Sequence, residues 1–229
     1  MIVSTQKVDF NVKIIGDIKN HTPLIFLHGF MGSMKSWDEI TPQFNPPIVL
    51  IDLPGHGQSY FKDIDNYSFR EWGIDFKFIL DQLEIKRINL CGYSMGGRLA
   101  LIFACEFSQM VNRLILEGTT AGIIDEAERE ERIGEDLLYR TEIKKDYLDF
   151  VKKWAENSLF ENQKGRNSSG WEVQQEIRLD QDEAQISLSL EFLGNGKMPS
   201  LWDKIKKLHS SVMLITGSED AKYCRIATE

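Results

Sequence analysis

One stretch of the sequence decides the fold, and it reads Leu90-Cys91-Gly92-Tyr93-Ser94-Met95-Gly96-Gly97-Arg98-Leu99-Ala100-Leu101. An apolar strand runs into a turn of small residues and then into a helix. The spacing Gly92-x-Ser94-x-Gly96 suits a nucleophile elbow, in which only small neighbours permit the strained turn that exposes the serine hydroxyl. The next backbone N–H, that of Met95, lies at the start of the helix and can donate to a developing oxyanion. Because glycine and serine also crowd into ordinary turns, the surrounding sequence has to decide whether Ser94 is catalytic.

Apolar patterns on both sides of this stretch predict an α/β fold. Residues 7–16 alternate apolar and polar positions, which is typical of an antiparallel edge strand. Further strands are predicted by apolar runs at 23–27, 47–52, 88–91, 113–117 and 211–216. Helical spacing at 68–84 and from Met95 to about Phe107 places helices between the strands. This alternation indicates a mostly parallel sheet with helices on both faces, which binds ligands at the carboxyl ends of its strands.

The pattern changes between residues 121 and 197. Charges are dense at 125–136, residues 141–157 have the spacing of a polar helix, and residues 163–170 are expected to form a polar linker. We therefore predict three segments, with the first part of the core at 1–120 and a helical cap or lid at 121–197 over the site. Residues 198–229 would form the second, incomplete part of the core.

Composition narrows the possible partners. The 229 residues carry a formal net charge of −8, which disfavours a binder of phosphate backbones, so no nucleic-acid partner is expected. The N-terminus lacks the basic start and apolar core of a signal peptide, and no apolar run approaches the roughly 20 residues of a membrane span. A cytoplasmic protein is therefore expected. The three cysteines, Cys91, Cys105 and Cys224, are scattered and indicate neither a disulfide framework nor a zinc site.

Four motifs in order resemble the α/β-hydrolase family over almost the whole chain. They are Leu27-His28-Gly29-Phe30, Asp52-Leu53-Pro54-Gly55-His56-Gly57-x-Ser59, Gly92-Tyr93-Ser94-Met95-Gly96-Gly97 and Gly217-x-Glu219-Asp220. The resemblance implies the α/β-hydrolase fold with an inserted helical cap. It also implies that the backbone N–H groups of Phe30 and Met95 form the oxyanion hole. Asp220 takes the position of the carboxylate that orients a catalytic histidine.

A narrower resemblance is to the 2-succinyl-6-hydroxy-2,4-cyclohexadiene-1-carboxylate (SHCHC) synthases of menaquinone biosynthesis. It is carried by Phe26-Leu-His-Gly-Phe-Met-Gly32, Gly92-Tyr-Ser-Met-Gly-Gly-Arg-Leu-Ala100, Glu128-Arg129-Glu-Glu-Arg132, Trp154 with Leu159-Phe160, Gly194-x-Gly196-x-x-Pro199-Ser200-Leu201-Trp202 and Asp220-Ala-Lys222-Tyr223. Arg98 is the most informative of these residues, because a guanidinium one turn beyond the serine suits a substrate with several carboxylates better than a neutral ester.

This resemblance implies a lyase that eliminates pyruvate from a cyclohexene dicarboxylate with a succinyl chain. Ser94 would act as a base, and Phe30 and Met95 would hold the enolate. The same resemblance implies that the substrate is bound by Arg98, Arg132 and Arg178, that Tyr93 and Trp154 line the pocket, and that Lys222 lies near its rim. No metal and no organic cofactor are implied. The expected partner is a small polycarboxylate, and the oligomeric state stays open.

A catalytic histidine should follow Asp220 in this family, but the four histidines, His21, His28, His56 and His209, all precede it. The last strand and closing helix of the family fold are also expected after residue 229. Truncation would explain both losses at once. Without its general base Ser94 should be largely inert, since loss of a triad member costs orders of magnitude in rate.

Two other functions remain open at this stage. The chain could be a serine hydrolase of carboxylesters or C–C bonds, with Ser94 as a covalent nucleophile. It could also be a non-catalytic ligand-binding protein that retains the elbow as a relic. Turnover and acyl-enzyme formation distinguish the three possibilities.

Overall fold

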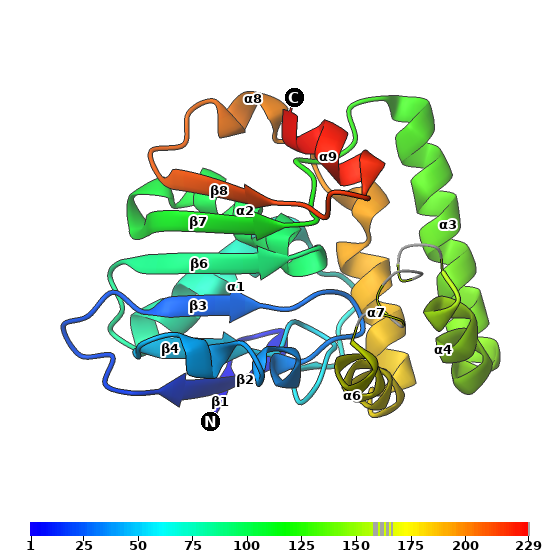
Figure 1. Ribbon diagram of the computed structural model, residues 1–229, viewed down its shortest axis with the longest axis horizontal. Helices are drawn as coiled ribbons and strands as arrows, with labels where there is room; N and C mark the ends of the chain where they lie inside the picture. Colours follow the sequence, from blue (N-terminus) through cyan, green and yellow to red (C-terminus); the bar gives the residue numbers. More distant parts are fainter. Residues whose placement is uncertain (158–159, 161–162, 164, 166, 229) are drawn as a thin grey trace.

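The computed structural model describes residues 1–157, 160, 163, 165 and 167–228, and in this part of the chain eight strands form one sheet (Figure 1). The strands are β1 (Ile2–Ser4), β2 (Val8–Ile15), β3 (Leu24–Leu27), β4 (Ile48–Ile51), β5 (Tyr60–Phe61), β6 (Ile88–Tyr93), β7 (Val111–Glu117) and β8 (Ser211–Ile215). Their order is β1-β2-β4-β3-β6-β7-β8, with β5 paired to β2. The run from β4 to β8 is parallel, whereas β2 is antiparallel to its partners. The predicted mostly parallel sheet is confirmed.

The prediction that residues 7–16 form an edge strand was wrong. They form β2, but β1 pairs with its outer side, with Val3 opposite Phe10. β1 has three residues, and Val3 is the one that is buried. A strand this short is below the length at which alternation becomes visible in a sequence.

Helices α1 (Phe69–Gln82) and α2 (Met95–Glu106) cover one face of the sheet and lie behind it in Figure 1. Trp72 stacks on Phe76 with ring centroids 5.2 Å apart, and its indole N–H donates to the Leu99 carbonyl at 3.0 Å. This contact joins the two helices over the main core. On the opposite face, the short 3₁₀ helices η1 (Met34–Trp37) and η2 (Thr41–Gln43) cover part of the sheet, and Trp37 packs on Phe26.

The described part of residues 121–197 contains α-helices that lie beyond the carboxyl ends of the parallel strands (Figure 1). They are α3 (Glu126–Lys145), α4 (Tyr147–Ala155), α6 (Ser168–Leu179) and α7 (Glu183–Leu193). The prediction of one helix over 141–157 was wrong, because Asp146 ends α3 and begins α4. Its Oδ1 accepts a hydrogen bond from the Asp149 backbone N–H at 3.0 Å. A short carboxylate at this position caps the new helix. The predicted linker at 163–170 includes residues 164 and 166, which lie outside the described residues, and α6 begins at Ser168.

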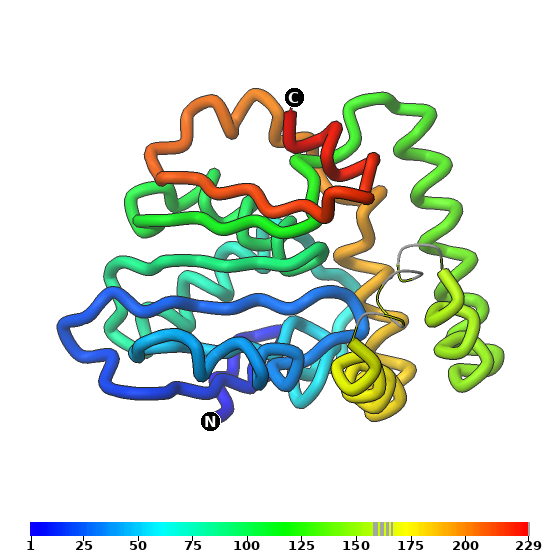
Figure 2. The backbone as a smooth tube through the Cα atoms, in the orientation of Figure 1, coloured from blue at the N-terminus to red at the C-terminus, as the bar shows by residue number. Residues whose placement is uncertain are grey.

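The last described elements are η5 (Asn195–Lys197), α8 (Trp202–Ile205), β8 and α9 (Ala221–Thr228). A further short helix, η3 (Ser108–Met110), precedes β7. β8 pairs with β7, and no described strand pairs with its outer side. The N-terminal and C-terminal ends of the tube lie at opposite edges of the sheet (Figure 2). In the described ranges, no helix has both the length and the apolar character needed to cross a membrane.

Candidate active site

Ser94 sits in a strained turn between β6 and α2. Its φ of +50° lies in the left-handed region, which costs a non-glycine residue about 1–3 kcal/mol. Two hydrogen bonds keep the backbone in this strained conformation. The Ser94 N–H donates to the Glu117 carbonyl and the Ser94 carbonyl accepts from Thr119 Oγ1, both at 2.8 Å. A Cβ on Gly92 would lie 2.4 Å from the Gly96 carbonyl oxygen, and one on Gly96 would lie 2.2 Å from that of Leu27. The turn therefore has the geometry that the spacing of small residues predicts for a nucleophile elbow.

The loop that carries Phe30 is fixed by hydrogen bonds of the buried His28 ring. The His28 Nε2 accepts from the Leu53 N–H at 2.9 Å, and its Nδ1 hydrogen bonds to the Gly29 carbonyl at 2.8 Å. Burial lowers the pKa of His28 to about 4, so the ring is neutral at pH 7. His28 is thereby a structural support for the loop that follows β3.

The turn after β4, Leu53-Pro-Gly-His-Gly57, supports the site without lining it. The Asp52 carboxylate accepts from the Met34 N–H at 2.6 Å and from the Gln58 N–H at 3.0 Å. Burial lowers the pKa of His56 to about 3, and its ring packs against those of His28 and Phe30. These contacts tie the loop after β4 to the loop after β3.

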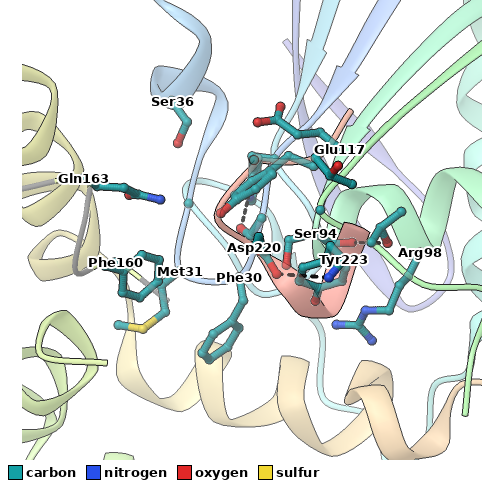
Figure 3. Close-up of a pocket in the computed structure, with 18 of the residues that line it drawn as sticks. Phe30, Met31, Ser36, Ser94, Arg98, Glu117, Phe160, Gln163, Asp220 and Tyr223 are labelled. Atoms are coloured by element: carbon teal, nitrogen blue, oxygen red, sulfur yellow. Dashed lines mark hydrogen bonds between the residues drawn. The ribbon is translucent and has the colours of Figure 1, made fainter. Parts of the chain in front are cut away.

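The elbow, the loop after β3 and the helices of residues 121–197 enclose a cavity of about 710 Å³ (Figure 3). Ser94 and Asp220 line it together with the three predicted arginines and the aromatic residues Phe30, Tyr93 and Trp154. Two predicted site residues do not line it. Met95 is buried at the start of α2, where its backbone N–H has no acceptor within the helix. Lys222 is exposed on α9, with its ammonium 5.8 Å from the centre of the Tyr223 ring.

Arg98 and Arg132 form one cationic part of this cavity. Arg98 is buried, and its Nη1 donates to the Leu193 carbonyl at 3.2 Å. Burial, and after it the charge of Arg132, lowers the pKa of Arg98 to about 10, which leaves the guanidinium charged at pH 7. Arg132 is partly exposed and pairs with Asp136. Two neighbouring cations that face a cavity favour a ligand with negative charge.

Arg178 forms a second cationic part, framed by aromatic rings. Its guanidinium carbon lies 4.4 Å from the ring centre of Phe160 and 5.3 Å from that of Trp171. Nη1 of this buried side chain has no hydrogen-bond partner among the described residues. Trp154 Nε1 is buried without a partner in the same part of the chain. Buried donors of this kind are satisfied when a ligand with acceptor oxygens binds.

Asp220 follows β8 and lies at the start of α9. Its Oδ1 accepts from the Tyr223 backbone N–H at 3.0 Å, so in this arrangement the carboxylate caps the helix. Tyr223 itself lines the cavity, and burial raises the pKa of its hydroxyl. The sequence analysis included Tyr223 in a motif but predicted no role for it. Its position three residues after Asp220, on the first turn of a helix, could have indicated that it lies at the site.

Glu117 is a second lining residue that sequence reasoning missed. It is the last residue of β7, and β7 pairs it with Tyr93 at the end of β6. Desolvation raises the pKa of its carboxyl, and its charge adds to the burial that raises the pKa of Tyr93 to about 12. The signal was available, because a polar residue at the carboxyl end of a parallel strand is a candidate ligand contact.

None of the four histidines both lines the cavity and keeps a free ring nitrogen, and all four lie in the described part of the chain. His28 lines the cavity, but both of its ring nitrogens are hydrogen bonded. His56 does not line it, and His21 is exposed with its Nδ1 bonded to the Lys19 carbonyl. His209 precedes β8, at the end of the strand away from the site. Among the described residues, no group of three or more His, Cys, Asp or Glu side chains is arranged to hold a metal.

The elbow on β6, the mostly parallel sheet and the strand-end cavity define the class. The family model of the α/β hydrolase fold matches residues 22–158. The chain belongs to the α/β-hydrolase family.

Within this family, the chain is similar to SHCHC synthases. A Bacillus subtilis (strain 168) protein assigned as such a synthase is 36% identical over 211 residues, which cover 90% of this chain and 76% of that protein. The SHCHC synthase of Pectobacterium atrosepticum is 30% identical, with 90% of this chain and 81% of that protein covered. The structure of MenH from S. aureus matches with a TM-score of 0.88 at 30% identity and covers 98% of this chain and 84% of that one.

More distant structures share the fold alone. An enol-lactonase from Burkholderia xenovorans LB400 matches with a TM-score of 0.80 at 17% identity, over all of this chain and 87% of that one. Since one fold hosts many chemistries, the site has to carry the argument for function.

Proposed function

We propose that this chain is built to eliminate pyruvate from 2-succinyl-5-enolpyruvyl-6-hydroxy-3-cyclohexene-1-carboxylate, which gives SHCHC in menaquinone biosynthesis. The observation that carries the proposal is that Ser94 and three arginines, Arg98, Arg132 and Arg178, line one cavity. The named substrate has carboxylates on the ring, on the succinyl chain and on the enolpyruvyl group. Guanidinium groups bind such carboxylates through paired hydrogen bonds, whereas a neutral ester needs no comparable charge. Similarity to SHCHC synthases supports the same assignment.

In the proposed reaction, Ser94 Oγ removes the ring proton next to the succinyl ketone and passes its own proton to a histidine oriented by Asp220. The electron pair moves to the ketone oxygen, and the backbone N–H groups of Phe30 and Met95 stabilise the enolate. When the enolate collapses, the ring double bond shifts and the C–O bond to the enolpyruvyl group breaks. Enolpyruvate leaves, takes up a proton and becomes pyruvate. Tyr93 and Trp154 contact the ring, and Lys222 lies near the rim.

The 229-residue chain should bind this substrate and turn it over slowly. Asp220 and Ser94 are present, but no histidine among the described residues is available to carry the proton between them. Loss of one triad member typically lowers the rate by orders of magnitude. A chain in which a histidine reaches between Ser94 and Asp220 should recover the activity.

Binding can be tested apart from turnover by calorimetry with 2-succinylbenzoate, a stable aromatic dicarboxylate that has the same succinyl chain. We expect Arg98→Met to weaken binding about tenfold or more, because the stem still packs but the guanidinium is gone. Arg225→Met is the matched control, because Arg225 is exposed on α9 and does not line the cavity, and its effect should stay within about twofold. Equal affinity of Arg98→Met and the unmodified chain would contradict an anion site at Arg98.

Turnover is measured as pyruvate release from the enolpyruvyl substrate, with lactate dehydrogenase as the coupling enzyme. We expect a low rate for the 229 residues, a much higher rate for a chain that contains the histidine, and no rate above background for Ser94→Ala in either. Equal rates with and without the histidine would overturn the triad argument. A burst of acyl-enzyme with an activated ester would favour a serine hydrolase. Tight binding without pyruvate release by the chain that contains the histidine would favour a non-catalytic binding protein.

A further inference from the structure

A buried carboxylate lies directly behind the cationic part of the cavity. Asp136 on α3 is 5% exposed, and its Oδ1 lies 3.0 Å from both Nε and Nη2 of Arg132. Its Oδ2 accepts from the Gly196 backbone N–H at 3.2 Å. Both carboxylate oxygens are therefore in use. A negative charge this close to a cationic site weakens the binding of anions. The position of Asp136 therefore indicates that this residue has another role.

One task is to fix the direction of Arg132. Arg132 and Asp136 are four residues apart on α3, so their side chains lie on the same face of the helix. The contact uses the Nε and Nη2 edge of the guanidinium and does not use Nη1. A partly exposed arginine samples many rotamers, and a buried carboxylate on one edge removes most of that freedom. The remaining edge is then held in one orientation at the cavity wall that Arg132 lines.

A second task is to hold the turn that follows α7. A Cβ on Gly194 would lie 2.6 Å from Asp136 Oδ2, and one on Gly196 would lie 2.6 Å from the Ile133 side chain. The turn therefore packs closely on α3. The residue before it, Leu193, provides the carbonyl that accepts from Arg98. One carboxylate thus connects the supports of both arginines.

We propose that Asp136 is a positioning residue, which aligns Arg132 directly and Arg98 through the 193–196 turn, so that the two guanidinium groups bind one polycarboxylate ligand together. It does not itself touch the ligand. The proposal rests on the proposed function, since it assumes an anionic ligand in this cavity. The charge of Asp136 also offsets the repulsion between the two cations. Consistent with this, Asp136 raises the pKa of Arg98, whereas Arg132 lowers it.

The test is the affinity of Asp136→Asn for 2-succinylbenzoate, measured by calorimetry with the 229-residue chain. Asparagine keeps an acceptor for the Gly196 N–H but removes the charge that holds Arg132. Positioning predicts binding about tenfold weaker. A purely electrostatic role predicts the opposite sign, because removal of a negative charge next to two arginines strengthens the binding of a dianion. Unchanged or tighter binding would therefore overturn the proposal.

Glu135→Gln is the matched control. Glu135 lies next to Asp136 on α3, and its Oε2 is 3.7 Å from Arg132 Nε, but the side chain is half exposed. Glu135→Gln also removes a negative charge next to Arg132, but it breaks no buried contact. The affinity should therefore change by no more than about twofold. A loss of affinity as large as that of Asp136→Asn would show that the buried contact is not what positions Arg132, and would overturn the proposal.

A second measurement needs neither a variant nor the ligand. In the NMR spectrum of the unmodified chain, the Nε–H of Arg132 should exchange slowly with solvent, unlike those of the exposed Arg70 and Arg113. Fast exchange would overturn the positioning role even if Asp136→Asn failed to fold. If the unmodified chain showed slow exchange and no affinity for 2-succinylbenzoate, the proposed function would fail, and with it the task assigned to the ordered arginine, while the structural contact itself would stand.

Discussion

Two strands of the sheet have nearly the same sequence and opposite surroundings. β4 reads Ile48-Val49-Leu50-Ile51, and β8 contains Val212-Met213-Leu214-Ile215. The four side chains of β4 are at most 1% exposed, whereas those of β8 are between 42% and 59% exposed. β4 pairs on both edges, with β2 and β3, and β8 pairs on one edge with β7. An apolar run therefore predicts a strand, but its burial depends on elements that lie elsewhere in the chain.

The candidate active site draws on both of these regions. Ser94 and Arg98 come from the elbow at the buried centre of the sheet, while Asp220 and Tyr223 come from the segment that follows β8. Local stability follows the number of buried apolar contacts. Ser94 and Arg98 are therefore held by the core, whereas Asp220 is held by an exposed strand and by its hydrogen bond at the start of α9.

The largest expected effect comes from making the same substitution, leucine to alanine, in each of the two strands. Leu50→Ala removes a fully buried side chain from β4 and should lower the free energy of unfolding by about 2–5 kcal/mol. Leu214→Ala removes a half-exposed side chain from β8 and should cost no more than about 0.5 kcal/mol. Urea unfolding followed by circular dichroism measures both. If Leu214→Ala cost as much as Leu50→Ala, β8 would be covered in solution.

The central strands and the elbow could be predicted from the sequence because their signals are local. Runs of apolar residues mark the strands, and the small residues around Ser94 are required by contacts within the turn itself. The break at Asp146 was missed, because residues on both sides of it have helical spacing and the break depends on one side-chain hydrogen bond. The exposure of β8 was also beyond a local pattern.

For the site, sequence patterns indicated which residue types would meet but not how they are held. The three arginines line one cavity with Ser94, and their role in binding a substrate stays a prediction. Asp136, the partner of Arg132, was not singled out, since a carboxylate in a charge-rich helix is usually on a solvated face. Its burial comes from the Gly194–Gly196 turn, which is about 60 residues away in the chain and approaches it only in the folded protein.

The second prediction concerns the acid stability of the buried region. Folding depresses the pKa of His28 from 6.5 to about 4, and that of His56 from 6.5 to about 3. The stabilisation that follows is complete above pH 6.5, where both states are neutral, and is lost as the pH falls, because the unfolded chain takes up protons first. For His28 alone the loss between pH 6.5 and pH 4 is about 3 kcal/mol.

Urea midpoints between pH 7 and pH 5 measure this effect, and His56→Gln should make the curve less steep. Glutamine can still donate to the Pro54 carbonyl that His56 contacts, but it does not take up a proton. His21→Gln, at an exposed histidine, is the control and should leave the slope unchanged. If His56→Gln left it unchanged as well, acid would act elsewhere, and the buried loops would not limit stability below neutral pH.

The smallest expected change in stability is that of Met213→Lys, and this variant tests whether the exposed strand β8 promotes self-association. An unpaired edge with apolar side chains is a template for pairing with another chain, and a lysine on such an edge opposes that pairing. Met213→Lys should change the free energy of unfolding by no more than about 0.5 kcal/mol, because the side chain is 59% exposed, and it should also reduce self-association. Light scattering over a concentration series measures the difference, and Lys204→Met serves as a control away from the strand. If the unmodified chain stayed monodisperse at every concentration, the open edge of β8 would be protected in solution, and the contrast with β4 would be smaller than the exposed fractions indicate.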